Sequence, residues 1–185
     1  MWWWASSTIV SGCKNTICES SIRSAIFNGC QNTTRCFSTD SVIVGGRVNM
    51  IQNNSNDSVI VGGLLNLIDN SNYSSIINGK QNTISGTSSH SSIIGGYKND
   101  ICNSFYSSII GGCQNCIMYS SQSAIIGGNN LLLNNKPNTV LVPTLLVSGS
   151  FSTDSGNTFG INGSFTTHKI KALHINGTIK AIEPY

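Results

Sequence analysis

The chain has 185 residues, a formal net charge of +3 and only 9% charged side chains, against roughly 25% in an ordinary soluble domain. Its 10 Lys and Arg residues form no stripe along the sequence, so we expect no nucleic-acid partner. No apolar run approaches the roughly 18 residues that a membrane-spanning helix needs, so we also expect no membrane span.

The N-terminus contains three consecutive tryptophans, Trp2, Trp3 and Trp4. Three exposed tryptophans would be costly, because large aromatic side chains lose favourable burial when they stand in water. We therefore predict that residues 1–6 are either a plug that closes the end of an assembly or an anchor that inserts into a capsid or fibre-base protein. The sequence leaves both alternatives open.

The first residues also lack the basic region and the sustained apolar stretch of a secretory signal. We therefore expect folding in a cytoplasm, where the seven cysteines would be thiols rather than a disulfide framework. Cys13 and Cys30 occupy the same column of the repeat described below, and we interpret them as a thiol pair. Cys113 and Cys116 have a Cys-x-x-Cys spacing, but no second such pair exists to complete a zinc site.

Residues 7–133 contain eight copies of one eleven-residue phrase, whose second glycine returns every 16 or 17 residues. Its clearest copy runs from Ser91 to Ile101 and reads SSIIGGYKNDI. A short, fixed period indicates identical units stacked on one another. We assign structural ladder roles to the recurrent positions, which in this copy are Ser91, Ile93, Ile94, Gly96, Asn99 and Ile101.

Each phrase predicts two strands and two turns. The β-branched run around the Ile-Ile pair predicts a strand of four to five residues, and Gly-Gly predicts a turn at positive φ. Asn-x-Ile predicts a second short strand, and a Ser/Asn-rich segment returns the chain to the next copy. The fold class that follows is all-β: a parallel β-roll, or flattened β-solenoid, of eight 16–17-residue coils with side-chain amide ladders between asparagines.

The two adjacent apolar columns predict association between chains. Neighbouring side chains in a strand point to opposite faces, so Ile93 and Ile94 cannot both fill the interior. The outward column would expose an apolar stripe along all eight coils, which is more than a soluble monomer usually exposes. We therefore expect identical chains to pack laterally over this stripe.

Residues 134–185 follow a different pattern. After a turn-rich boundary, Gly149, Gly163 and Gly177 recur 14 residues apart, and the Asn-Gly pairs at 162–163 and 176–177 are typical of type I′ turns. We predict a smaller β-repeat module, built either as a narrower coil or as interleaved hairpins. It would serve as a cap, a shaft or an attachment piece.

The stacked Ser-x-Ile-Ile-Gly-Gly phrase resembles the β-roll heads of trimeric autotransporter adhesins and related repetitive fibre proteins of phages and large DNA viruses. The resemblance covers roughly residues 7–133 and implies a homotrimer. The chain departs from the bacterial adhesins in its longer period, and we expect it to have no signal peptide, coiled-coil stalk or barrel anchor. A virion protein assembled in a host cytoplasm fits these departures better than a cell-surface protein.

No motif in the sequence points to catalysis, and we expect neither a metal nor a cofactor. The three histidines are dispersed. A glycoside hydrolase would need clustered carboxylates, and Asp40, Asp57 and Asp69 are the residues that could lie along one edge. We interpret these three as solvated turn residues.

The sequence therefore predicts a non-catalytic structural virion protein: a trimeric fibre, spike or capsid-decorating protein. The alternative is an adhesin that binds a carbohydrate or another host receptor, with recognition carried by the aromatic turn residues Tyr73, Tyr97, Phe105, Tyr106 and Tyr119. Two more remote hypotheses are an ice-binding solenoid, which needs a regular outward threonine array, and a tailspike hydrolase.

Overall fold

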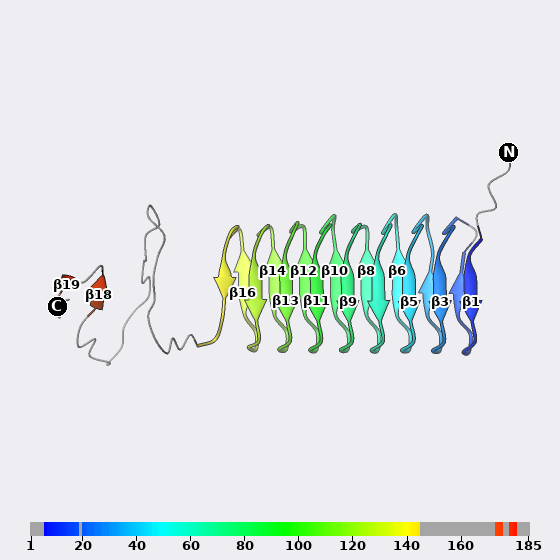
Figure 1. Ribbon diagram of the computed structural model, residues 1–185, viewed down its shortest axis with the longest axis horizontal. Helices are drawn as coiled ribbons and strands as arrows, with labels where there is room; N and C mark the ends of the chain where they lie inside the picture. The colour runs from blue at the N-terminus through cyan, green and yellow to red at the C-terminus, as the bar shows by residue number, and fades with distance from the viewer. Residues whose placement is uncertain (1–5, 19, 145–172, 176–177, 181–185) are drawn as a thin grey trace. The chain divides into compact units, whose positions relative to one another are not determined.

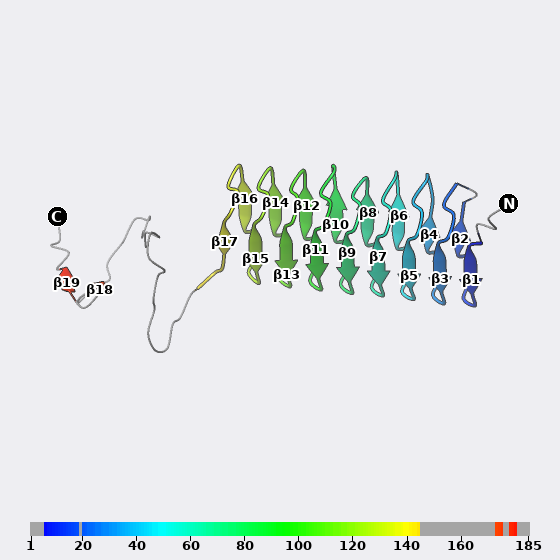
Figure 2. The ribbon, with the colours of Figure 1, turned by 45° about the horizontal axis from the view of Figure 1, so that its top comes forward.

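The computed structural model describes residues 6–18, 20–144, 173–175 and 178–180. These residues form strands and turns; no helix among them is long and apolar enough to cross a membrane. The chain winds into a β-solenoid of stacked two-strand coils, in which each turn of the chain adds one strand to each of two parallel sheets (Figures 1 and 2). The predicted all-β solenoid is confirmed.

The two sheets contain the odd-numbered and the even-numbered strands, and we call them the odd sheet and the even sheet. The odd sheet has nine strands: β1 Thr8–Val10, β3 Ala25–Phe27, β5 Val42–Val44, β7 Val59–Val61, β9 Ser75–Ile77, β11 Ser92–Ile94, β13 Ser108–Ile110, β15 Ala124–Ile126 and β17 Val140–Leu141. The even sheet has eight strands: β2 Thr16–Ile17, β4 Thr33–Thr34, β6 Met50–Gln52, β8 Leu67–Asp69, β10 Thr83–Ser85, β12 Asp100–Cys102, β14 Cys116–Met118 and β16 Leu132–Asn134.

The strands are two or three residues long, shorter than the four to five residues expected. Left-handed backbone at both ends sets this limit. In the coil of β11, His90 has φ of +58° just before the strand, and Gly95 has φ of +69° just after it. A residue with positive φ cannot continue an extended strand, so each corner ends the strand that enters it.

The interior is a double column of isoleucines. The central side chain of each strand points inward, so Ile93 of β11 and Ile101 of β12 are both fully buried. Thr34 and Leu133 take this position in two coils of the even sheet. In the first coil, Ile9 is 45% exposed because only one neighbouring strand pairs with β1. Stacking therefore supplies most of the burial that each coil needs.

The residue after each inward isoleucine of the odd sheet faces outward, as predicted. Ile94 and Ile110 are each 43% exposed, and the parallel register aligns them directly. The complete column, which we call the outward stripe, consists of Val10, Phe27, Val44, Val61, Ile77, Ile94, Ile110 and Ile126. The structure therefore contains an unbroken apolar stripe on one sheet.

The alternation between 16 and 17 residues arises at one corner, after the even strand. A 17-residue coil has two left-handed residues there, such as Asn53 and Asn54, whereas a 16-residue coil has one, such as Asn70. The next serine confirms the insertion: Ser55 donates its hydroxyl to the carbonyl three residues earlier, and Ser71 to the carbonyl two residues earlier. The extra residue stays in a surface turn, so the strands keep their register.

Paired strands continue beyond the eighth phrase, because β17 adds to β15 in the odd sheet. Farther along, in a second unit of the chain, β18 (Leu173–Ile175) and β19 (Thr178–Lys180) pair antiparallel. Ile175 pairs with Thr178, and the intervening Asn176 and Gly177, for which a type I′ turn is predicted, lie outside the described residues. The three N-terminal tryptophans and the other C-terminal phrases lie outside the described residues.

Candidate functional site

The recurrent asparagine ties each coil to the next. Asn99 is fully buried; its Nδ2 donates to the carbonyls of Gly111 and Gly112 at 3.3 and 3.2 Å, and its Oδ1 accepts from the backbone N–H of Asn115 at 3.0 Å. The expected amide-to-amide ladder is therefore wrong. The side-chain amide instead forms hydrogen bonds with backbone groups of the following coil, because the glycine corner turns those carbonyls toward it.

The two glycines of each phrase differ in what they tolerate. A Cβ added to Gly96 would lie 2.3 Å from Nδ2 of Asn99 and 2.5 Å from the carbonyl oxygen of Gly112. A Cβ added to Gly95 would meet nothing within 4 Å. This explains why only the first glycine is replaced in other copies, by Ser11, Asn28 and Asn78. The second glycine is required by close approach of the next coil.

Two columns of buried serines line the opposite corner. In the predicted column, the Ser91 hydroxyl donates to the carbonyl of Ser104 at 2.9 Å and accepts from the N–H of Ser107 at 3.1 Å. Sequence reasoning missed the second column, which comprises Ser21, Ser38, Ser55, Ser71, Ser88, Ser104 and Ser120. Its signal was a serine three residues before the first column in every copy except the first, hidden by the many other serines of the return segment.

Tyr73 and Tyr106 come together through a residue that sequence analysis did not single out. His90 stacks between them, with ring centroids 4.8 Å from each tyrosine and interplanar angles of 12° and 11°. The three residues hold the same left-handed turn position in successive coils. The His90 ring is therefore covered on both faces, whereas each tyrosine is covered on one face and remains exposed.

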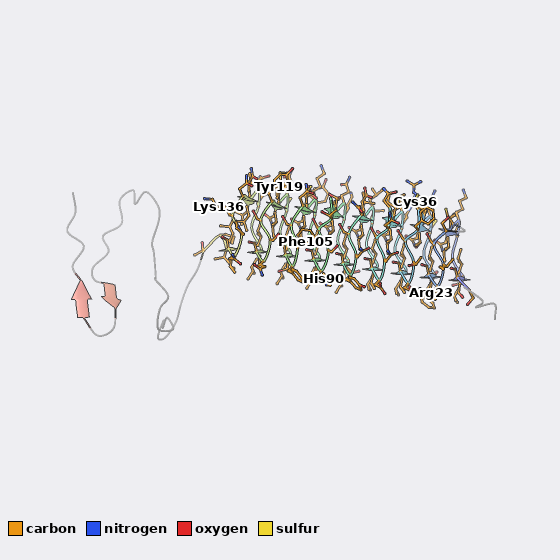
Figure 3. The ribbon with its side chains drawn as sticks, turned by 90° about the horizontal axis from the view of Figure 1, so that it is seen from above. Arg23, Cys36, His90, Phe105, Tyr119 and Lys136 are labelled. Atoms are coloured by element: carbon orange, nitrogen blue, oxygen red, sulfur yellow. The ribbon has the colours of Figure 1, made fainter. Side chains whose placement is uncertain are left out.

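The other predicted recognition residues do not join this stack. Tyr119 lies with Cys36 along the opposite long side of the solenoid from His90 and Arg23 (Figure 3). Tyr97 lies in the glycine corner, where Nζ of Lys80 is 5.7 Å and Nζ of Lys98 is 5.2 Å from its ring centroid. Tyr97 and Tyr119 therefore lie on surfaces separate from the Tyr73–His90–Tyr106 stack.

The carboxylates also divide between surfaces. Asp40 and Asp57 hold the same left-handed turn position in consecutive coils, whereas Asp69 lies at the end of β8. Nε of Arg23 donates to Oδ1 of Asp40 at 2.7 Å, and this hydrogen bond holds the pKa of Asp40 below its usual value. Only two of the three carboxylates share an edge, and one of those two is ion-paired.

The outward face of the even sheet contains a carboxyl group in an unfavourable environment. Asp100 of β12 lies opposite Cys116 of β14, and its Oδ1 is buried without a hydrogen-bond partner. Burial raises the pKa of Asp100. Burial, together with the charges of Asp100 and Cys102, raises the pKa of Cys116 to about 11. Both groups are therefore stabilised in their neutral forms, which makes Cys116 a poor nucleophile.

Replacing Asp100 with asparagine is expected to stabilise the protein at neutral pH by about 1 kcal/mol, because asparagine carries no charge that folding must bury. A carboxyl group whose pKa is raised by folding opposes folding once the pH exceeds its unfolded pKa. The gain should therefore disappear as the pH falls below the ordinary pKa of 3.8. Thermal unfolding of both proteins at pH 7 and pH 3 measures it; an equal gain at both values would contradict this explanation.

Within the part of the chain that the structure describes, no three His, Cys, Asp or Glu side chains are grouped as metal ligands would be. The distinctive surfaces are instead the outward stripe, the Tyr73–His90–Tyr106 stack and the corner around Tyr97. Comparison with known proteins finds no matching family model and no matching curated protein.

Proposed function

We propose that the chain is a structural virion protein, a trimeric fibre, spike or capsid-decorating protein without catalytic activity that assembles in a host cytoplasm. The observation that carries this proposal is the outward stripe, whose members from Ile77 to Ile126 are 38–44% exposed. Exposure of such an apolar sheet face to water is unfavourable, so its burial against a partner would stabilise an assembly. The resemblance to trimeric fibre proteins supplies the number three.

The geometry of the odd sheet suits packing against a copy of itself. Eight stripe residues at the strand spacing of a parallel sheet extend about 34 Å, in a straight line set by the uninterrupted register. The neighbouring outward column holds small or β-branched side chains, which let another sheet approach closely: Thr8, Ala25, Val42, Val59, Ser75, Ser92, Ser108, Ala124 and Val140. Identical chains would present the same stripe, which favours a closed symmetric assembly.

Replacing Ile110 with lysine is expected to dissociate the assembly. The charge would have to be buried without a partner in the interface, so the dissociation constant should rise by about 100-fold or more. Size-exclusion chromatography with light scattering at micromolar concentration measures this change. The side chain is exposed in the isolated chain, so circular dichroism should show an unchanged fold.

The matched control is Met118→Lys, at an outward position of the even sheet. This variant should assemble like the wild type. A well-folded wild-type monomer at micromolar concentration would overturn the proposed assembly. Equal effects of the two lysine substitutions would show that the odd sheet is not the specific interface.

The second candidate function is an adhesin that binds a carbohydrate or another host receptor. The observation that favours it is Tyr97, which is exposed and lies within cation–π distance of two lysines. Of the five aromatic residues predicted to carry recognition, it is the one with two lysine ammonium groups near its ring, and these indicate an anionic ligand.

A further inference from the structure

We propose that the glycine-corner edge of the solenoid binds an extended acidic polysaccharide that carries a carboxylate or sulfate on every second sugar. This edge, which we call the basic edge, consists of the two residues that follow the second glycine of each coil. It develops the adhesin candidate and does not require assembly through the odd sheet. The loops that follow the odd strands form one long side of the solenoid (Figure 1).

Folding gathers on this edge basic residues that are scattered in the sequence. Lys14, Arg47, Lys80 and Lys98 all lie on it and are all exposed. Parallel bridges define the first of its two columns, which reads Cys13, Cys30, Arg47, Leu64, Lys80, Tyr97, Cys113 and Asn129. The second column holds the next residue of each coil: Lys14, Gln31, Val48, Leu65, Gln81, Lys98, Gln114 and Asn130. Neither column contains a carboxylate.

The opposite corner has a different charge. It carries Asp40 and Asp57, and its Arg23 is bonded to Asp40. That is the single ion pair among the described residues. The cations of the basic edge are therefore not paired with a carboxylate of the described chain and can interact with an anionic ligand. A surface that carries only positive charges attracts anions at moderate ionic strength.

The spacing of the charges indicates a polymer rather than a small anion. Arg47 and Lys80 are two coils apart in the same column, which corresponds to about 10 Å. A linear polysaccharide with an acidic group on every second sugar places its charges two sugar rings apart, a comparable interval. Lys14, Arg47 and Lys80 lie in every second coil, so such a chain lying along the solenoid axis can meet them with successive acidic groups. Lys98 lies one coil beyond Lys80.

Apolar groups lie beside these charges. Leu65 is 43% exposed and lies in the coil between Arg47 and Lys80. Tyr97 lies in the coil after Lys80, next to Lys98, and is 36% exposed. Sugar rings have apolar C–H faces between their polar substituents, so apolar side chains beside the cations match sugar faces beside the acidic groups.

A nucleic acid fits the same edge less well. Its phosphates are more closely spaced than these cations, and single strands are bound by several open aromatic platforms. The two columns contain one aromatic residue, Tyr97, and two ammonium groups already lie near its ring. The observations therefore favour the acidic polysaccharide.

The test is calorimetric titration of the full chain with two probes of the same length, a hyaluronan oligosaccharide with one carboxylate per disaccharide and a κ-carrageenan oligosaccharide with one sulfate per disaccharide. The chain should bind at least one probe, with affinity that falls as salt is raised. Lys80→Gln/Lys98→Gln should weaken binding by about tenfold, since it removes two of the contacting charges. The matched control is Arg35→Gln, which removes an exposed cation of the even sheet and should bind like the wild type.

The proposal is overturned if neither probe binds, if a neutral cello-oligosaccharide of equal length binds as well, or if the double variant binds like the wild type. It is also overturned if single-stranded DNA binds more tightly at the same ionic strength, because that result would assign the edge to a nucleic acid. Light scattering on the same samples records the oligomeric state. A polysaccharide-binding monomer would contradict only the assembly proposal, and a trimer that does not bind would contradict only this one.

Discussion

Gly96→Ala is expected to lower the free energy of unfolding by about 3 kcal/mol or more. The substitution adds a strained backbone, because φ at this position is +83°, and left-handed strain in a non-glycine residue costs about 1–3 kcal/mol. It also places a methyl group 2.5 Å from the carbonyl oxygen of Gly112. Since that oxygen belongs to the backbone of the next coil, the clash can be relieved only by separating two coils.

The control is Gly95→Ala, one residue earlier. Its φ of +69° is also left-handed, but the added Cβ would meet nothing within 4 Å, so we expect a cost of only about 1 kcal/mol. Urea titration followed by circular dichroism gives both values. Equal losses would mean that backbone strain, rather than contact between coils, makes the second glycine indispensable.

Asn99→Ala is expected to cost about 3 kcal/mol. The change removes the acceptor of the Asn115 N–H and the amide donor to Gly111 and Gly112. A buried polar group left without a partner costs about 1–3 kcal/mol. The carbonyl of Gly112 retains the N–H of Tyr97 as a partner, and the carbonyl of Gly111 retains Nδ2 of Asn115 at 3.5 Å, so the loss falls mainly on the Asn115 N–H.

Asn129→Ala provides the comparison, because this asparagine is exposed in the same corner of another coil and should change stability by less than about 0.5 kcal/mol. Hydrogen exchange would locate the damage, since the amide of Asn115 should lose protection in Asn99→Ala and keep it in Asn129→Ala. Retained protection at Asn115 in the first variant would show that the hydrogen bonds of Asn99 to the next coil's backbone are not what holds these coils together.

The recurrence of Ile93, Ile94 and Ile101 at a fixed period was enough to predict the parallel two-sheet solenoid. Side chains alternate faces along any strand, so two adjacent apolar columns imply one buried and one exposed column whatever the details of the turns. The outward stripe could therefore be predicted, and the structure places it as expected. What the stripe packs against was not determined in the same way, because that depends on a second molecule.

The turns were where sequence reasoning reached its limit. The bonding of Asn99 to the next coil's backbone, and the shortening of β11 to three residues, follow from left-handed dihedral angles at the corners, and the residue types alone do not specify these angles. The second serine column could have been found by its spacing. It was concealed because exposed and buried serines look alike in a sequence.

The grouping of variable side chains on the surface was decided by tertiary structure alone. Residues 16 or 17 positions apart become neighbours only when the extra residue of a longer coil is absorbed in one turn. This register stacks His90 between Tyr73 and Tyr106, and it brings Arg47 and Lys80 into one column on an edge without carboxylates. The repeat thus determined by itself the solenoid and its apolar stripe, whereas the lateral alignment of coils determined which variable side chains lie together.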